Sequence, residues 1–253
     1  MTARGRGRIV RIVAVVGLVV VALGIIGFLW WAQPQPLLPE AEAALSSTPT
    51  ASFEQGDDGR LTWTATEMQP TAGLVLYTGG KVPPAAYAPA ARSIAEAGYL
   101  VAIVPAPFNF AIFDTDAAAA VIEDHPDIVA WAVGGHSLGG ASAALFIDGH
   151  PGIVHALVLW ASYSSADLSA DGLDVLSAYG TLDGGVPTFT DPTNVANLGP
   201  AVEPLVIEGG NHEQMGWYTG QPDDPPATIT REAQQSAVVE GTISLMDQLS
   251  PTD

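Results

Sequence analysis

The sequence has 253 residues, no cysteine and a formal net charge of −19 at pH 7. Without cysteine it cannot form disulfides, a thiolate nucleophile or a cysteine-ligated zinc site, and its negative charge opposes binding to nucleic-acid phosphates. Hydrophobic residues make up 48% of the chain and charged residues 14%, so there is enough apolar material for a large core, which argues against wholesale disorder.

The first predicted element is an uncharged apolar stretch at residues 12–32. A helix of about 20 apolar residues is long enough to cross the hydrocarbon core of a bilayer. Trp30 and Trp31 stand at its far end, where indole rings favour the membrane interface, and four arginines precede it. Because basic residues favour the cytoplasmic side, we predict a cytoplasmic basic tail at 1–11, a transmembrane anchor at 12–32 and an extracytoplasmic remainder at the cell membrane.

A cleaved signal sequence is the alternative interpretation of this stretch, and it would give a secreted protein. Ala41, Glu42 and Ala43 form a small-x-small pattern of the kind that signal peptidases cut. The apolar stretch is longer than the roughly 7–15 residues of a usual signal peptide, and the pattern lies well beyond its end. The sequence therefore favours the anchor.

A proline-rich segment follows at residues 33–51, with prolines at 34, 36, 39 and 49. Proline disfavours a stable helix and favours extended chain. We predict a linker that acts as a stalk and holds a globular domain, residues 52–253, away from the membrane.

Within the globular domain, short apolar stretches alternate with amphipathic ones. The apolar stretches are nearly continuous, which is typical of parallel strands covered on both faces. One stretch, 61–66, alternates with period two and predicts an antiparallel edge strand. Together they predict a doubly wound, mostly parallel α/β sheet flanked by helices, with functional residues beyond the carboxyl ends of its strands. The predicted strands are 61–66, 74–77, 99–104, 128–133, 154–160, 173–178 and 204–207, and the predicted helices are 87–97, 117–123, 138–147 and 231–249.

The segment from Gly135 to Gly139 reads Gly-His-Ser-Leu-Gly and matches the pattern G-x-S-x-G. An apolar predicted strand precedes it and a helix of small residues follows. In this setting a serine is held on a sharp strand-to-helix turn, and glycines on either side avoid clashes with neighbouring backbone. The pattern predicts Ser137 as a nucleophile.

A serine hydroxyl needs a base, and the base needs a carboxylate to orient it. On a sheet with this kind of turn the acid and then the histidine follow the serine in the chain. His212 is the histidine that follows a late predicted strand. Asp183 comes directly after the strand at 173–178 and is the preferred acid, with Asp191 as the alternative.

A tetrahedral oxyanion needs two backbone N–H donors. One is expected from Leu138, directly after the nucleophile. The other is expected from the loop after the first parallel strand, where we favour Gly80 or Lys81. The Lys81 side chain, from the only lysine in the sequence, either orients an acidic substrate or is simply solvated.

These segments resemble the α/β-hydrolase superfamily, and within it the small, lidless, dienelactone-hydrolase-like branch known as α/β hydrolase fold-five. The resemblance covers about residues 52–250, through LVLYTGGKVPPAAYAPAARSIAEAGYLVAIVPAPFN, GGHSLGGASA, YGTLDG and GGNHEQMGWY. It implies a triad of Ser137, Asp183 and His212, with no cofactor and no metal. Dienelactone hydrolases use a cysteine nucleophile where this sequence has serine, and residues 161–172 leave no room for a cap domain.

The function that these residues predict is a carboxylesterase-like serine hydrolase that cleaves a small, accessible ester or acyl bond through an acyl-enzyme. The predicted partners are that small-molecule substrate and the membrane, through the N-terminal helix, with no nucleic acid. A thioesterase, peptidase or acyltransferase would use the same residues. A membrane-anchored receptor or scaffold that kept the fold without catalysis, and an envelope enzyme acting on polymer or lipid, are further alternatives.

Overall fold

The computed structural model describes residues 3–249 and divides the chain into two units, Met1–Gln33 and Pro34–Asp253. The described part of the first unit forms one helix, α1 (Ala3–Trp31). Within it, Arg11–Trp31 has a mean hydropathy of 3.1 and its residues are exposed. This stretch is long and apolar enough to cross a membrane, and a signal sequence would meet the same criteria.

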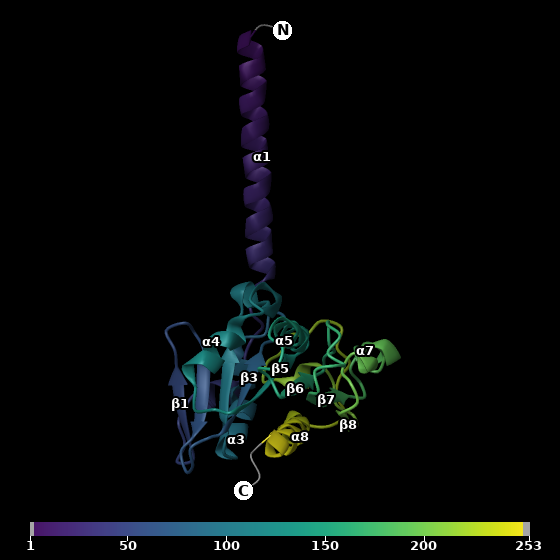
Figure 1. Ribbon diagram of the computed structural model, residues 1–253. Helices are drawn as coiled ribbons and strands as arrows, with labels where there is room; N and C mark the ends of the chain where they lie inside the picture. The colour runs from purple at the N-terminus through teal and green to yellow at the C-terminus, as the bar shows by residue number, and fades with distance from the viewer. Residues whose placement is uncertain (1–2, 250–253) are drawn as a thin grey trace. The chain divides into compact units, whose positions relative to one another are not determined.

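In the second unit, eight strands of the described chain form one sheet in the order β1-β2-β4-β3-β5-β6-β7-β8 (Figure 1). The pairs β1–β2 and β2–β4 are antiparallel and the other pairs are parallel. The predicted α/β class is therefore confirmed, but the outermost edge strand is β1 and not the predicted 61–66. The strands are β1 (Ala51–Gln55), β2 (Leu61–Ala65), β3 (Ala72–Tyr77), β4 (Leu100–Val104), β5 (Ala130–His136), β6 (Ala156–Trp160), β7 (Asp174–Gly180) and β8 (Val202–Ile207).

Helices cover both faces of this sheet, as Figure 1 shows. Alternate side chains of β3 enter two separate apolar clusters: Leu74 and Leu76 enter one, Val75 and Tyr77 the other. The first cluster includes residues of α3 (Ala88–Glu96) and α8 (Arg231–Leu249), and the second includes residues of α4 (Ala117–Asp124) and α5 (Leu138–Gly149). Burial on both faces is the physical reason for the unbroken apolar stretches in the sequence.

Short helices lie in the connections, and the sequence analysis did not predict them. Proline in the first turn of most of them fixes a backbone angle that suits a helix start. They are α2 (Pro39–Ala43), η1 (Pro84–Tyr87), η2 (Pro107–Asn109), η3 (Ala111–Phe113), α6 (Val186–Phe189), α7 (Pro192–Ala196) and η4 (Glu213–Met215).

The segment predicted to be a stalk packs on the domain instead, so that prediction was wrong. Gln35 donates its backbone N–H to the Lys81 carbonyl, and Leu37 forms an antiparallel bridge with Tyr218. Ala41 and Ala44 are fully buried. Small buried side chains let this strap, residues 34–50, pack against the core.

Candidate active site

Ser137 occupies the turn between β5 and α5 in a strained conformation, with φ 54° and ψ −122°. A non-glycine residue at positive φ is uncommon and marks a backbone held by its surroundings. A Cβ at Gly135 or Gly139 would lie 2.5 Å or 2.2 Å from the Tyr77 carbonyl oxygen. Both glycines are therefore required for the turn to fit against β3.

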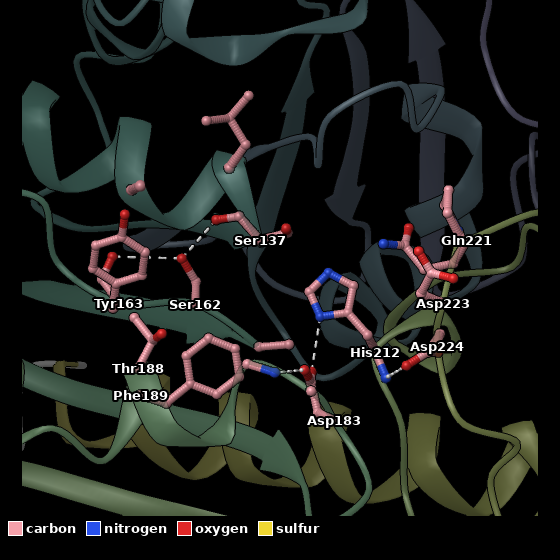
Figure 2. A pocket seen from close by; sticks show the side chains of 16 residues that line it. Ser137, Ser162, Tyr163, Asp183, Thr188, Phe189, His212, Gln221, Asp223 and Asp224 are labelled. Atoms are coloured by element: carbon pink, nitrogen blue, oxygen red, sulfur yellow. Dashed lines mark hydrogen bonds and ion pairs between the residues drawn. The ribbon is translucent and has the colours of Figure 1, made fainter.

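The backbone of Ser137 is fixed from both sides. Its N–H donates to the Trp160 carbonyl at 3.0 Å, and its own carbonyl accepts the Ser162 hydroxyl at 2.6 Å (Figure 2). Ser162 follows β6, next to the turn, and sequence reasoning did not identify it. Its position beyond the carboxyl end of a parallel strand was the available signal.

His212 and Asp183 meet across two loops that follow β8 and β7. His212 Nδ1 lies 2.8 Å from Asp183 Oδ2, and Asp183 Oδ1 accepts the Gly185 N–H at 2.7 Å. Asp183 is only 5% exposed. A carboxylate on Nδ1 keeps the proton on that nitrogen and leaves Nε2 to act as acceptor.

The imidazole of His212 lies between Asp183 and Ser137 in Figure 2, and all three residues line one cavity. Within the described chain no hydrogen bond joins the Ser137 hydroxyl to the ring. Such contacts often tighten only when substrate is bound.

Asp191, the alternative acid, lies elsewhere. It begins α7, where its Oδ1 accepts the Thr193 N–H at 2.9 Å. This is an N-cap, which satisfies one of the free donors of a helix start. Asp191 does not line the cavity that holds the other candidate residues.

A third aspartate, Asp224, supports the histidine loop and was missed from the sequence. Its two carboxylate oxygens accept the backbone N–H groups of His212 at 3.2 Å and Glu213 at 2.8 Å. Burial raises the pKa of this carboxyl above its ordinary value. An aspartate in a Pro-Asp-Asp-Pro loop is usually a turn residue, so the sequence carried no signal for this contact.

The cavity has a volume of about 460 Å³ and opens beside Ser137. Its wall combines apolar side chains, such as Leu138 and Phe189, with hydroxyls and the carboxylates of Asp223 and Asp224. No lysine or arginine is among the described residues that line it. Over residues 3–249 no group of three or more His, Asp or Glu side chains is arranged to hold a metal ion.

The loop after β3 holds the two alternatives for the second oxyanion donor, Gly80 and Lys81, and at most one of them is available. The Lys81 N–H donates to the Asn109 carbonyl at 2.7 Å, so it is not available for an oxyanion. Lys81 has φ 64°, in the left-handed region that a non-glycine residue seldom adopts. Gly80 remains as a candidate donor. It has no side chain, and a Cβ added there would lie 3.8 Å from Leu138 Cδ2. Within the described chain neither the Gly80 nor the Leu138 N–H has an acceptor.

A buried pair, Tyr87 and His136, joins the loop after β3 to the turn that carries Ser137. The Tyr87 hydroxyl accepts the Gly79 N–H at 3.0 Å and lies 2.9 Å from His136 Nδ1. With one proton and two acceptor positions, the hydroxyl can bridge the Gly79 N–H and the His136 ring. The His136 and His212 rings are 4.5 Å apart between centroids. Burial, then the neighbouring His212, holds the pKa of His136 well below its usual value.

The sequence from residue 73 to 236 matches the model of the alpha/beta hydrolase family. The chain belongs to this family. The match covers more than half of the 253 residues, and it includes the Ser137 turn, the loops that carry Asp183 and His212, and most of the sheet. The predicted superfamily is thereby confirmed, and the chain is a hydrolase by family.

Among solved structures, this hydrolase is similar to a predicted CIB-like hydrolase from Thermoplasma acidophilum. The two share 16% sequence identity with a TM-score of 0.54, over 77% of this chain and 99% of the other. At this identity the likeness shows a shared fold. No curated protein matches the sequence of this hydrolase.

Proposed function

We propose that this hydrolase cleaves esters of small acids through an acyl-enzyme on Ser137. The observation that carries the proposal is the contact between buried Asp183 and His212, 2.8 Å apart, on the same cavity as a serine held at φ 54°. An oriented imidazole beside a strained, fixed serine is the arrangement that activates a hydroxyl for acyl transfer.

The reaction proceeds in two halves. Ser137 Oγ attacks the ester carbonyl carbon while His212 Nε2 takes the hydroxyl proton, and the N–H groups of Leu138 and Gly80 stabilise the oxyanion. When the tetrahedral intermediate collapses, the ester bond breaks and the imidazolium gives its proton to the leaving alcohol. Water then attacks the acyl-enzyme by the same route and releases the acid. Asp183 stays ionised and stabilises the imidazolium.

The cavity favours a neutral or cationic substrate over an anionic one. Its described lining has no basic side chain, while Asp223 and Asp224 place carboxylates beside His212. A substrate carboxylate would therefore meet like charge and no partner, which lowers its affinity. A volume of about 460 Å³ is enough for a short acyl chain and a small alcohol.

We further propose that α1 anchors the enzyme in a membrane with the hydrolase unit outside the cytoplasm. The apolar stretch Arg11–Trp31 supports a span, and the arginines that precede it support the orientation. Small esters outside the cell would then be its substrates.

The test uses the full chain in detergent with a fluorophosphonate probe. We expect the parent to be labelled and Ser137→Ala and His212→Ala to lose labelling. Ser244→Ala, at an exposed position on α8, and His150→Ala are matched controls that keep it. A folded parent that stays unlabelled would contradict the triad and favour a non-catalytic receptor or scaffold.

The substrate proposal has its own measurement. Nitrophenyl esters of butyric acid and of succinic acid have similar length but differ by one carboxylate. We expect a higher kcat/KM for the butyrate, and a smaller difference in Asp223→Asn. Equal kcat/KM values for both esters at low salt would contradict the charge argument.

A further inference from the structure

An exposed cluster of apolar side chains follows β4. We call residues 107–113 the aromatic loop. Phe108 is 55% exposed, Ile112 43% and Phe113 58%, and Phe110 is partly buried beneath them. Large apolar side chains scattered singly on a surface are normal, but three within six residues form a patch that is typical of an interaction surface.

The backbone of this loop is well held, so the exposure is built into the fold. Phe108 and Asn109 have φ of 53° and 63°, and the Asn109 carbonyl accepts the Lys81 N–H. The Phe113 ring packs edge-on against Phe108 and Phe110, with centroids 6.1 and 6.2 Å away. Two neighbouring residues at positive φ are costly and persist only where surrounding contacts hold them.

Covalent connection limits how far this loop can be from the membrane anchor. Lys81 accepts the Gln35 N–H at 2.8 Å and donates to Asn109 at 2.7 Å. Gln35 follows Trp31, the last residue of α1, by four residues. Four Cα–Cα steps span at most ~15 Å. The aromatic loop is therefore joined, through Lys81, to a segment that follows the end of the apolar helix by four residues along the chain.

We propose that the aromatic loop inserts into the interface of the membrane that α1 crosses. The proposal rests on the proposed anchor and is independent of the catalytic residues. Phenylalanine and isoleucine gain free energy when they enter the boundary between headgroups and acyl chains. Asp114 and Asp116 directly follow the loop, so its preferred surface is made of zwitterionic and not anionic lipid.

This contact sets the orientation of the enzyme. The loop extends from the carboxyl edge of the sheet, and Ser137 lies beyond the carboxyl end of β5 on the same edge. The opposite edge, where β5 begins, then faces away from the bilayer. The tether and the loop together hold the active-site edge near the lipid surface.

The absence of cysteine makes a direct test possible. Single cysteines are placed in the full chain at Phe113, at Val129 and at Leu18, labelled with one environment-sensitive fluorophore, and studied in phosphatidylcholine nanodiscs. Val129 is the matched control, because it is 61% exposed and precedes β5 at the opposite edge. Leu18 lies in the apolar helix and reports whether the anchor is in the bilayer.

We expect lipid-attached nitroxide to quench the label at 113 at least several-fold more than the label at 129, with iodide in water showing the reverse. Equal quenching at 113 and 129, with Leu18 quenched by lipid, overturns the loop proposal and leaves the anchor intact. An unquenched Leu18 overturns the anchor and the loop proposal with it. A label at 113 that neither quencher reaches indicates a protein occupant and also overturns the proposal. Fluorophosphonate labelling of each variant reports separately on the proposed function.

Discussion

At the scale of single residues, two aspartates in one loop region have separate roles. Asp183 contacts the His212 ring, whereas Asp191 caps α7. We expect Asp183→Asn to lower kcat by about 10⁴-fold, because the amide favours the wrong histidine tautomer. Asp191→Asn is the matched control. It should leave kcat unchanged, since asparagine is also a good cap. Steady-state ester hydrolysis measures kcat for both variants. A large loss of kcat in Asp191→Asn would contradict these separate roles.

Two buried tyrosines allow a second comparison at this scale. Tyr87 accepts the Gly79 N–H in the loop after β3, and Tyr77 accepts the Ala118 N–H at the start of α4. Changing either to Phe leaves a buried N–H without a partner, which costs about 1–3 kcal/mol of stability.

Only Tyr87→Phe should also slow catalysis. It removes the acceptor of the Gly79 N–H, and Gly79 directly precedes the proposed oxyanion donor Gly80. We expect a roughly 10-fold drop in kcat with little change in KM, below the ~10²–10³-fold effect of losing an oxyanion donor outright. Equal kcat values for the two variants would mean that Tyr87 is purely structural.

At the scale of elements, the strap at residues 34–50 is part of the hydrolase core. Ala44 is fully buried in the cluster that also holds α3 and α8, while its neighbour Ala43 is exposed. We expect Ala44→Leu to destabilise the domain by about 1–3 kcal/mol through overpacking. Ala43→Leu should change stability by less than about 0.5 kcal/mol. Thermal unfolding of the full chain measures the stability of both variants. If the strap were a free stalk, the two variants would have equal unfolding midpoints.

At the scale of the whole molecule, His136 links folding stability to pH. Burial holds its pKa well below the ordinary value of 6.5, so the native state keeps it neutral while the unfolded chain takes up a proton. Its contribution to stability is therefore complete above about pH 6.5 and falls as the pH drops further, by up to ~1.4 kcal/mol per pH unit.

Denaturant unfolding of the full chain between about pH 5 and about pH 8 measures this slope. We expect a shallower slope for His136→Asn than for the parent. His155→Asn, at an exposed position, is the control and should keep the parental slope. Identical slopes in all three proteins would mean that His136 does not carry the pH dependence.

Local sequence patterns were enough to predict the class of the sheet, most of its strands and helices, and the segments that contain Ser137, Asp183 and His212. Unbroken apolar stretches and the glycines around Ser137 are local features, so they can be recognised without knowing what packs on them. The folded chain was needed to show that Asp183 and not Asp191 contacts His212, that Lys81 donates to Asn109, and that Asp224, Ser162 and Tyr87 support the site. It also placed the proline-rich strap on the core. These contacts join residues far apart in the chain, and their formation depends on loop paths and burial that no local pattern encodes.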